Sequence, residues 1–368
     1  MLFAAGGTGG HLFPGIAVAE AARQAVGAEV LFVGTQNGME KDVIPQMGFP
    51  LQFIPAQQLR GRDWLGVVHA LVAAGRAVGV AWRIVRKFTP DVIFSIGGYA
   101  SGPTVVVGWL RRIPCVLLEP NTIPGMTNKL LGRFAAKVCV GFAPATKYFP
   151  TRKAIWTGNP VRWSDSESRK DAGRTQSEQS YFTLFIFGGS AGARRINQIL
   201  PQAVGLLGAT TTPLRIVHQT GKADYEDVKS LYTTLGVKAE VVSFIEDMRE
   251  MYLAADLVVC RAGAMTVAEL TSLGKPAILI PYPYAVDDHQ RANAEVLVGA
   301  RAAQMVLDAE LTPERVSDEL RTLIADRQRL AAMAQAMASL GRPDATMAVV
   351  RECLACVPAS IRPNLEEP

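Results

Sequence analysis

Residues 260–270 combine the groups needed to bind an anion and a sugar ring. This segment, CRAGAMTVAEL, follows an apolar run at 256–260 that we expect to form a strand. A strand, a turn of small residues and a helix N-terminus present free backbone N–H groups and a positive dipole end to an anion. Glu269 could accept hydrogen bonds from both hydroxyls of a ribose. Because Thr266 and Glu269 also fit the helix capping box S/T-x-x-E, a purely structural role stays open.

Three more glycine-rich turns of similar design favour ligand binding. Each follows an apolar run and precedes a helical pattern: GGTGGH at 6–11, GGYASG at 97–102 and GGSAGA at 188–193. Glycines let a backbone approach a bulky ligand closely. None of these turns reads G-x-G-x-x-G, which disfavours a dinucleotide-dependent oxidoreductase. The first and third lie about 180 residues apart, so we expect two similar doubly wound α/β domains.

Two polar side chains follow predicted strands, where open α/β sheets bind ligands. His11 ends the first glycine turn, and Asn121 follows the apolar run 114–118. Imidazole titrates near neutral pH, so His11 is a candidate general base, although a helix cap or a packing residue is the alternative. Asn121 offers a neutral donor and acceptor.

Alternating apolar runs and helical patterns predict the order of the elements. We expect a first domain at 1–160, a second at 161–341, and a polar linker or loop at 164–180. From 312 to about 356 the pattern is helical, interrupted at 341–343. The predicted strands lie at 1–5, 29–34, 51–55, 91–95, 114–118, 136–140 and 154–156, then at 181–187, 214–218, 240–244, 256–260 and 277–281.

Charge is distributed unevenly along the 368 residues. Residues 1–160 hold 16 Lys and Arg against 7 Asp and Glu, whereas the remainder holds 22 against 26. A basic first half suggests an anionic partner, but no aromatic–basic motif supports nucleic acid. The apolar segment 64–87 contains His69, Arg76 and Arg83, which makes it a poor membrane span. It reads either as a core helix or as a patch, rimmed by basic residues, that rests on an anionic bilayer.

The cysteines and acidic residues bear on the cellular compartment and on metal binding. Five scattered cysteines favour a reducing compartment, and we expect no secretory signal before the first glycine turn. Neither a His/Cys cluster nor a DxD pair in a suitable context predicts a catalytic metal.

Eight motifs, in order along the chain, resemble those of the MurG family of glycosyltransferases, in glycosyltransferase family 28. Besides the three glycine turns and 261–269, they are EPN at 119–121 with PGMTN at 124–128, GNPVR at 158–162, FIEDM at 244–248 and DHQRAN at 288–293. A single glycine turn would be weak evidence, whereas eight ordered motifs are specific.

The resemblance implies the GT-B fold, an α/β architecture of two doubly wound Rossmann-like domains facing across a cleft. It implies inverting transfer of N-acetylglucosamine from UDP-GlcNAc to the muramyl C4 hydroxyl of lipid I, which makes lipid II for peptidoglycan synthesis. The first domain would face the acceptor and the membrane, with a C-terminal helix at about 342–357 packed back on it, and the second would bind the UDP-sugar. The expected location is peripheral, on the cytoplasmic side of the inner membrane. Expected partners are UDP-GlcNAc, lipid I, an anionic membrane surface and cell-division or wall-synthesis proteins, without nucleic acid, cofactor or metal.

Site residues also follow from the resemblance, position by position. His11 would be the catalytic base. Near the donor sugar, the resemblance places Asn121 and Gln290, with Thr8, Gly9 and Gly10 in the wall that faces the sugar. The diphosphate would be bound by Ser190 and by the 264–268 turn (Ala264, Met265, Thr266, Val267, Ala268). In the nucleoside, Ile245 would contact the uracil through its backbone and Glu269 would contact the ribose, while Arg162 would help to hold the nucleotide.

One loop departs from the family pattern. Where the family usually has His-Glu-Gln-Asn, this chain has Leu118-Glu119-Pro120-Asn121. Leu118 cannot hydrogen-bond through its side chain, and Pro120 lacks an N–H. We therefore expect any polar contact of those two positions to be lost.

Two other functions remain as alternatives. A UDP-GlcNAc 2-epimerase would use the same nucleotide sugar, but it would need several ionisable groups around the sugar. A non-catalytic nucleotide-sugar-binding scaffold would not need an intact base and donor set, and His11, Asn121, Glu269 and Gln290 are all present.

Overall fold

The computed structural model describes residues 1–4, 6, 9–55, 64–98, 100–161, 163, 181–189, 192–208 and 213–362, with side chains of 64–74 excepted. The chain forms two compact units, Met1–Asp165 with Asp344–Pro368, and Ser166–Pro343. The predicted linker 164–180 and the predicted site residues Thr8, Arg162 and Ser190 lie outside the described residues.

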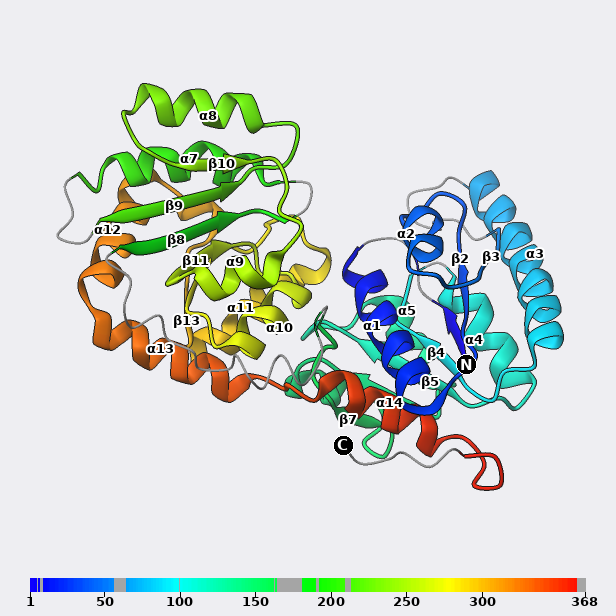
Figure 1. Ribbon diagram of the computed structural model, residues 1–368. Coiled ribbons are helices and arrows are strands. Elements are labelled where there is room, and N and C mark those ends of the chain that lie inside the picture. Colours follow the sequence, from blue (N-terminus) through cyan, green and yellow to red (C-terminus); the bar gives the residue numbers. More distant parts are fainter. Residues whose placement is uncertain are drawn as a thin grey trace. The chain divides into compact units, whose positions relative to one another are not determined.

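The first unit is built on a seven-stranded parallel sheet in the order β3-β2-β1-β4-β5-β6-β7 (Figure 1). The strands are nearly continuous apolar runs, as expected where helices cover both faces of a parallel sheet. They are β1 (Leu2–Ala4), β2 (Leu31–Gly34), β3 (Leu51–Phe53), β4 (Ile93–Ser95), β5 (Cys115–Glu119), β6 (Lys137–Val140) and β7 (Ala154–Trp156).

Alternate side chains of these strands divide into two apolar cores. Phe3 and Phe94 point to the face covered by α1 and α14, where they meet Ile16 and Val350. Their neighbours along the strands, such as Ile93, point to the face covered by α3, α4 and α5. The helices are α1 (Gly9–Val26), α2 (Glu40–Gln46), α3 (Trp64–Phe88), α4 (Ser101–Leu110), α5 (Met126–Leu131), the 3-10 helix η1 (Ala143–Tyr148) and α14 (Ala345–Ala355).

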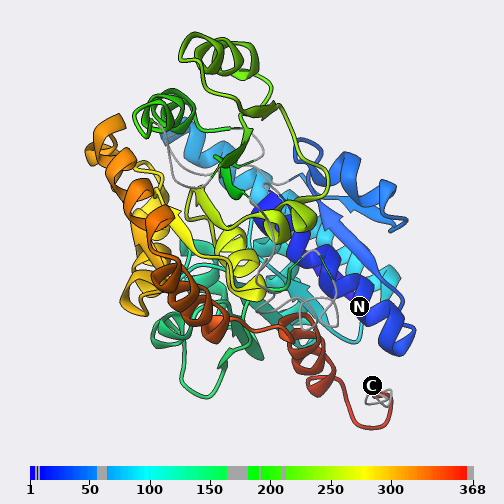
Figure 2. The same ribbon diagram turned by 60° about the vertical axis from the view of Figure 1, so that its left-hand side comes forward.

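Helix α14 belongs to this first unit although it comes from the end of the chain. Its residues Val349 and Val350 are fully buried in the same cluster as Leu12 and Ile16 of α1. Figures 1 and 2 both show α14, in red, beside α1, in blue. The C-terminal helix therefore completes one face of the first sheet.

The second unit repeats the plan with six parallel strands in the order β10-β9-β8-β11-β12-β13. Its strands are β8 (Phe182–Phe187), β9 (Leu214–Gln219), β10 (Glu240–Val242), β11 (Leu257–Cys260), β12 (Ala277–Leu279) and β13 (Ala303–Met305). Its helices are α7 (Arg194–Gly205), α8 (Tyr225–Thr234), α9 (Met248–Ala254), α10 (Ala264–Leu273), α11 (His289–Gly299), α12 (Pro313–Ala325) and α13 (Arg327–Leu340), with the 3-10 helices η2 (Val286–Asp288) and η3 (Asp308–Glu310).

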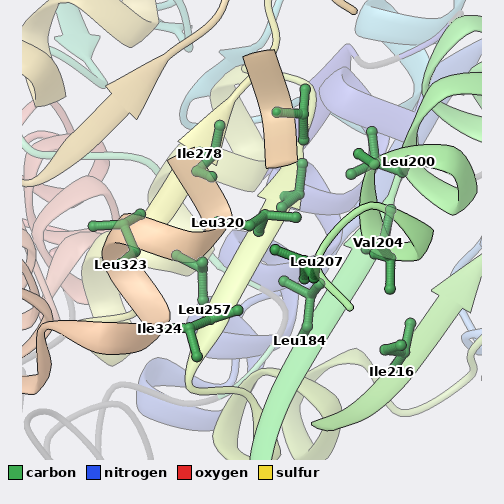
Figure 3. Packing of buried hydrophobic residues seen from close by; sticks show 14 of the residues in the cluster. Leu184, Leu200, Val204, Leu207, Ile216, Leu257, Ile278, Leu320, Leu323 and Ile324 are labelled. Atoms are coloured by element: carbon green, nitrogen blue, oxygen red, sulfur yellow. The ribbon is translucent and has the colours of Figure 1, made fainter. Parts of the chain in front are cut away.

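One core of this unit joins the sheet to α7 and α12. Figure 3 shows Leu200 and Val204 of α7 with Leu320 and Leu323 of α12, over strand residues such as Leu257. All five are buried. This packing fixes α7 against the sheet.

The predicted α/β class and its two doubly wound parallel sheets are confirmed. The sequence analysis missed β13, whose three residues carry no β-branched side chain. None of the helices in the described part of the chain combines the length and the apolarity needed to cross a bilayer.

Candidate active site

The sheet topology brings each pair of glycine-rich segments to one place. In the first sheet, β1 and β4 are neighbours from which the strand order runs in opposite directions, and in the second sheet β8 and β11 are. The turns at 6–11 and 97–102 follow β1 and β4, while those at 188–193 and 261–264 follow β8 and β11. Such switch points are where open α/β sheets bind ligands, because the diverging loops leave a crevice.

The turn after β8 depends on glycine at Gly192. Its φ is +80°, and a Cβ there would collide with the carbonyl oxygen of Thr220. The Gly192 N–H donates to the Gly189 carbonyl at 3.0 Å, which closes the turn before α7. Helix α7 has no side-chain cap at Ala193, and Arg194 in its first turn is exposed. This helix N-terminus can therefore present amides and a cation to a phosphate.

The turn after β11 leads into α10 without a capping box. Gly263 is the N-cap and Thr266 lies inside the first turn of the helix, so Thr266 and Glu269 do not form the capping box that the sequence had left open. Because Val267 N–H already donates to the Gly263 carbonyl at 2.9 Å, the amides left for a diphosphate are those of residues 264–266 (Ala264, Met265, Thr266). Val267 is buried in the helix, and Ala268 lies in the same turn.

Two side-chain donors, one partly and one completely buried, fix the turn between β11 and α10. Arg261 donates through Nη1 to Asp308 Oδ1 at 2.8 Å and to the Pro281 carbonyl at 3.0 Å. Asn293, from α11, donates through Nδ2 to the Ala262 carbonyl at 3.2 Å. Arg261 therefore stabilises the loop after β12. Together with Asn293, it holds the turn between β11 and α10 in one conformation before a ligand binds.

Glu269 lies in α10 and is almost completely buried. Its carboxylate accepts a hydrogen bond from the Tyr252 hydroxyl, with 2.9 Å between the oxygen atoms, and its exposed fraction is 2%. A buried carboxylate needs such partners because leaving water is costly for the charged group. The sequence did not indicate this pair, since Tyr252 comes from a different helix.

Ile245 follows β10, and its backbone amide is engaged by a residue that the sequence analysis missed. Ile245 N–H donates to Gln219 Oε1 at 2.9 Å, and Gln219 Nε2 donates to the Gly189 carbonyl at 3.2 Å. Gln219 is 2% exposed at the end of β9. It therefore ties the glycine turn after β8 to the segment after β10. The Ile245 carbonyl remains suited to accept from the N–H of a uracil ring.

Gln290 lies in the first turn of α11, at the same sheet edge. Its Oε1 accepts from the Tyr282 N–H at 3.0 Å, so its amide NH₂ is the end suited to meet a sugar hydroxyl. The preceding residues Asp287 and Asp288 have φ values of +53° and +52°. Two consecutive acidic residues in this conformation shape a loop that turns sharply before α11.

In the first unit, the structure corrects the place of His11. The sequence pattern predicts a helix that starts at Phe13, but helix α1 begins at Gly9, so Gly9, Gly10 and His11 form its first turn instead of an irregular loop. His11 is half-buried. Its position at the start of a helix after β1 still puts it at the carboxyl edge of the sheet.

The segment before α1 is held by a buried carboxylate. Glu40 is 1% exposed, and Oε1 accepts from both the N–H and the hydroxyl of Thr35 at 2.8 Å. A Cβ on Gly6 would lie 2.6 Å from the same oxygen, and a Cβ on Gly98 would collide with the Gly6 carbonyl. Gly6 is thus packed tightly between α2 and the turn after β4, with no space for a side chain. The sequence analysis did not identify Glu40.

Asn121 lies in a loop organised by Glu119. The Glu119 carboxylate accepts from Asn121 N–H at 2.9 Å, Asn128 Nδ2 at 2.9 Å and Gly125 N–H at 3.2 Å. Burial raises the pKa of Glu119, and these hydrogen bonds pull the pKa back down. The two departures from the family pattern do not remove the contacts that hold this loop, because positions 118 and 120 accept hydrogen bonds through their backbone carbonyls. Leu118 and Pro120 accept through their carbonyls from Asn128 and Asn159.

The structure thus gathers the described site residues at two sheet edges. His11 and Asn121 lie at the carboxyl edge of the first sheet. The second sheet carries Ile245, Gln290 and Glu269, with the turn residues Ala264, Met265 and Thr266, at its carboxyl edge. The latter arrangement offers helix N-termini for phosphates and buried polar groups for a nucleoside. Among the described residues, no group of three His, Cys, Asp or Glu is placed to hold a metal ion.

Comparison with known proteins identifies two family domains in the chain. The glycosyltransferase family 28 N-terminal domain matches residues 1–140, and the glycosyltransferase family 28 C-terminal domain matches residues 183–349.

Individual relatives agree over the whole length. A Myxococcus xanthus protein named UDP-N-acetylglucosamine–N-acetylmuramyl-(pentapeptide) pyrophosphoryl-undecaprenol N-acetylglucosamine transferase is 44% identical over 368 residues, all of this chain and 95% of that protein. The crystal structure of Acinetobacter baumannii MurG superimposes with a TM-score of 0.80 at 33% identity, covering 96% of this chain and 98% of that one. A UDP-GlcNAc 2-epimerase from Neisseria meningitidis reaches a TM-score of 0.68 at 14% identity, covering 96% of this chain and 99% of that one. The last likeness shows the fold alone.

Proposed function

The chain belongs to glycosyltransferase family 28, and on that premise we propose that it transfers N-acetylglucosamine from UDP-GlcNAc to lipid I. The acceptor is the muramyl C4 hydroxyl, and the product is lipid II for peptidoglycan synthesis. The observation that carries this proposal is the 44% identity, over the entire chain, to a relative named for that transfer.

The second unit is proposed to bind the donor. The turns before α7 and α10 contact the diphosphate, with Ser190 in the first and Ala264, Met265 and Thr266 in the second. The Ile245 backbone recognises uracil and Glu269 takes the ribose hydroxyls. Supporting this assignment, the described groups all follow strands at the carboxyl edge of the second sheet, and the two turns flank the switch point between β8 and β11.

The remaining donor contacts belong to the sugar and the nucleotide. Gln290 and Asn121 address N-acetylglucosamine, Arg162 holds the nucleotide, and Thr8, Gly9 and Gly10 shape the wall facing the sugar. The contact to Tyr282 supports the role of Gln290, because Oε1 accepts from the Tyr282 N–H and the amide NH₂ is then the end that can donate to a sugar hydroxyl.

The chemistry is an inverting displacement at the anomeric carbon. The C4 oxygen of the muramyl sugar attacks the face opposite to UDP, the glycosidic C–O bond breaks, and UDP carries away the electron pair. His11 accepts the C4 hydroxyl proton as general base. The charge that develops on the leaving diphosphate is stabilised by the amides and dipole at the N-terminus of α10.

The first unit is proposed to face the acceptor and the membrane. Large apolar side chains in the C-terminal parts of α3 and α4, and shortly after α5, are exposed: Trp82 and Phe134 by 41%, Trp109 by 52% and Leu110 by 53%. The Trp109 and Phe134 rings contact each other with centroids 5.1 Å apart.

Basic side chains accompany this apolar surface. The Arg111 guanidinium lies 5.4 Å from the centroid of the Trp82 ring. Arg112, three residues after Trp109, and Arg133, directly before Phe134, are exposed. Aromatic rings seat at the level of lipid headgroups, and arginines attract anionic lipids. We therefore assign this surface to peripheral docking on the cytoplasmic face of the inner membrane, where lipid I and wall-synthesis or division proteins would meet the enzyme.

The epimerase alternative is not favoured. Relatives at 44% identity are named as transferases, whereas the likeness to an epimerase lies at 14% identity.

A direct test follows UDP release by the purified protein in the presence of chelator. We expect release from UDP-GlcNAc to depend on a short-chain lipid I analogue and to stop when the analogue lacks the C4 hydroxyl. Equal release with and without the acceptor would contradict the proposal.

A further inference from the structure

Tyr252 is a buried aromatic residue of α9 whose ring is fixed by the central strand β8. Its exposed fraction is 0%. The ring meets those of Phe185 and Phe187 edge-on, with centroids 5.9 Å away in both cases. Phe185 and Phe187 are themselves stacked at 4.8 Å. Such edge-to-face packing leaves the tyrosine ring little freedom, so the direction of its hydroxyl is set by the core.

That hydroxyl is directed at Glu269. It donates to Glu269 Oε2 with 2.9 Å between the oxygens, and a hydrogen bond to a carboxylate is stronger than one between neutral groups. Glu269 has a flexible side chain, whereas Tyr252 is held by the sheet. The contact therefore fixes the orientation of the carboxylate rather than that of the ring.

A second contact ties the C-terminal ends of the same two helices together. Lys275, directly after the left-handed C-cap Gly274 of α10, is 5% exposed. Its ammonium donates to the Leu253 carbonyl at 3.0 Å and to the Ala255 carbonyl at 3.2 Å. These are the last carbonyls of α9, where a cation is favourable. Helix α9 is thus clamped to α10 at two points.

We propose that Tyr252 is a positioning residue for nucleotide recognition, which orients Glu269 toward the ribose and links it to the base-binding segment. Helix α9 begins at Met248, three residues after Ile245, so the clamp also sets the distance between the uracil and ribose contacts. This inference rests on the proposed ribose role of Glu269. The competing explanation is that Tyr252 and Glu269 form a buried structural pair that no ligand reaches.

Comparing two ligands separates these explanations. We would measure, by calorimetry, the affinities for UDP and for 2′,3′-dideoxy-UDP, which lacks both ribose hydroxyls. The variants are Tyr252→Phe, which removes only the hydroxyl, and Glu269→Gln. The matched control is Tyr232→Phe, which removes a buried hydroxyl of the same unit that lies 3.1 Å from His218 Nδ1. The ratio of the two affinities does not depend on the fraction of protein that is folded.

The expected result is selective. Tyr252→Phe should weaken UDP binding about tenfold and leave dideoxy-UDP binding within twofold of wild type, while Tyr232→Phe leaves the ratio unchanged. Equal weakening of both ligands, or no weakening, would overturn the positioning role. If Glu269→Gln abolishes the preference for UDP but Tyr252→Phe preserves it, only the role of Tyr252 fails. If wild-type protein binds both ligands equally well, the ribose role of Glu269 fails, and the positioning role fails with it.

Discussion

Acid should destabilise the second unit through one buried histidine. His218, on β9, is completely buried. Its Nδ1 lies 3.1 Å from the Tyr232 hydroxyl and its Nε2 lies 3.2 Å from Asn197 Oδ1. Asn197 belongs to α7 and donates to the Thr220 carbonyl at 2.9 Å. The imidazole therefore supports the helix whose N-terminus is proposed to receive the diphosphate.

The sign and the size of the effect follow from the pKa. Burial lowers the pKa of His218 from 6.5 to about 3, so below pH 6.5 the unfolded chain binds a proton that the folded chain does not. The stability contribution is complete above the unfolded pKa and is lost as pH falls toward the folded pKa. Each pH unit in that window costs about 1.4 kcal/mol. Between about pH 7.5 and about pH 5 the loss is ~2 kcal/mol.

Hydrogen exchange is the appropriate assay, because all five tryptophans lie in the first 163 residues and fluorescence would not report on the second unit. We would compare exchange of the β8 and β9 amides at the two pH values in wild type and His218→Gln. The difference between the two proteins isolates the histidine, since all other titrating groups are shared.

The variant should lose ~2 kcal/mol less protection than wild type on acidification. Parallel pH dependences in the two proteins would refute the reasoning, because they would mean that His218 binds its proton equally in the folded and unfolded states.

Three further predictions concern the catalytic, donor and membrane roles. His11→Ala should lower kcat about 10²–10⁴-fold and remove the acidic limb of the pH–rate profile; near-wild-type turnover with an unchanged profile would exclude His11 as the base. Gln219→Leu leaves the Ile245 N–H without its buried acceptor, so the free energy of UDP binding should weaken by about 1–3 kcal/mol. The control Gln219→Glu keeps an acceptor oxygen at that place and should retain more of the UDP affinity. Equal losses of affinity for the two variants in calorimetry would contradict the bridging role. Trp109→Ser should weaken binding to anionic vesicles by about 1–2 kcal/mol while turnover on a short-chain acceptor is unchanged; undiminished sedimentation with vesicles would show that this surface does not dock.

The parts of the fold that local patterns encode were predictable. A buried parallel strand is an apolar run, and a ligand-binding turn needs small residues, so Phe182–Phe187 and the glycine turn that follows it stand out in the sequence. The residue at which a helix starts was harder to predict from the sequence. Backbone geometry at Gly263 begins α10, and no side chain signals it. The same holds for α1, which begins at Gly9.

The supporting residues were not predictable from the sequence, because their partners lie on other elements. Gln219 meets Gly189 and Ile245 across 30 and 26 residues, and Tyr252 meets Glu269 from a neighbouring helix. Only the packing of helices on the sheet brings these groups together. Sequence motifs therefore located the ligand-facing turns, whereas the polar contacts that hold those turns could be identified only from the structure.

The measurement that tests the central claim most directly is the identity of the product. Purified protein, UDP-GlcNAc and a short-chain lipid I analogue would be incubated with chelator, and the lipid product analysed by mass spectrometry and NMR. We predict a lipid carrying one added N-acetylhexosamine, joined by a β-1,4 bond to the muramyl sugar. An α linkage, a different acceptor position, or conversion of the donor to its 2-epimer without a lipid product would contradict the account.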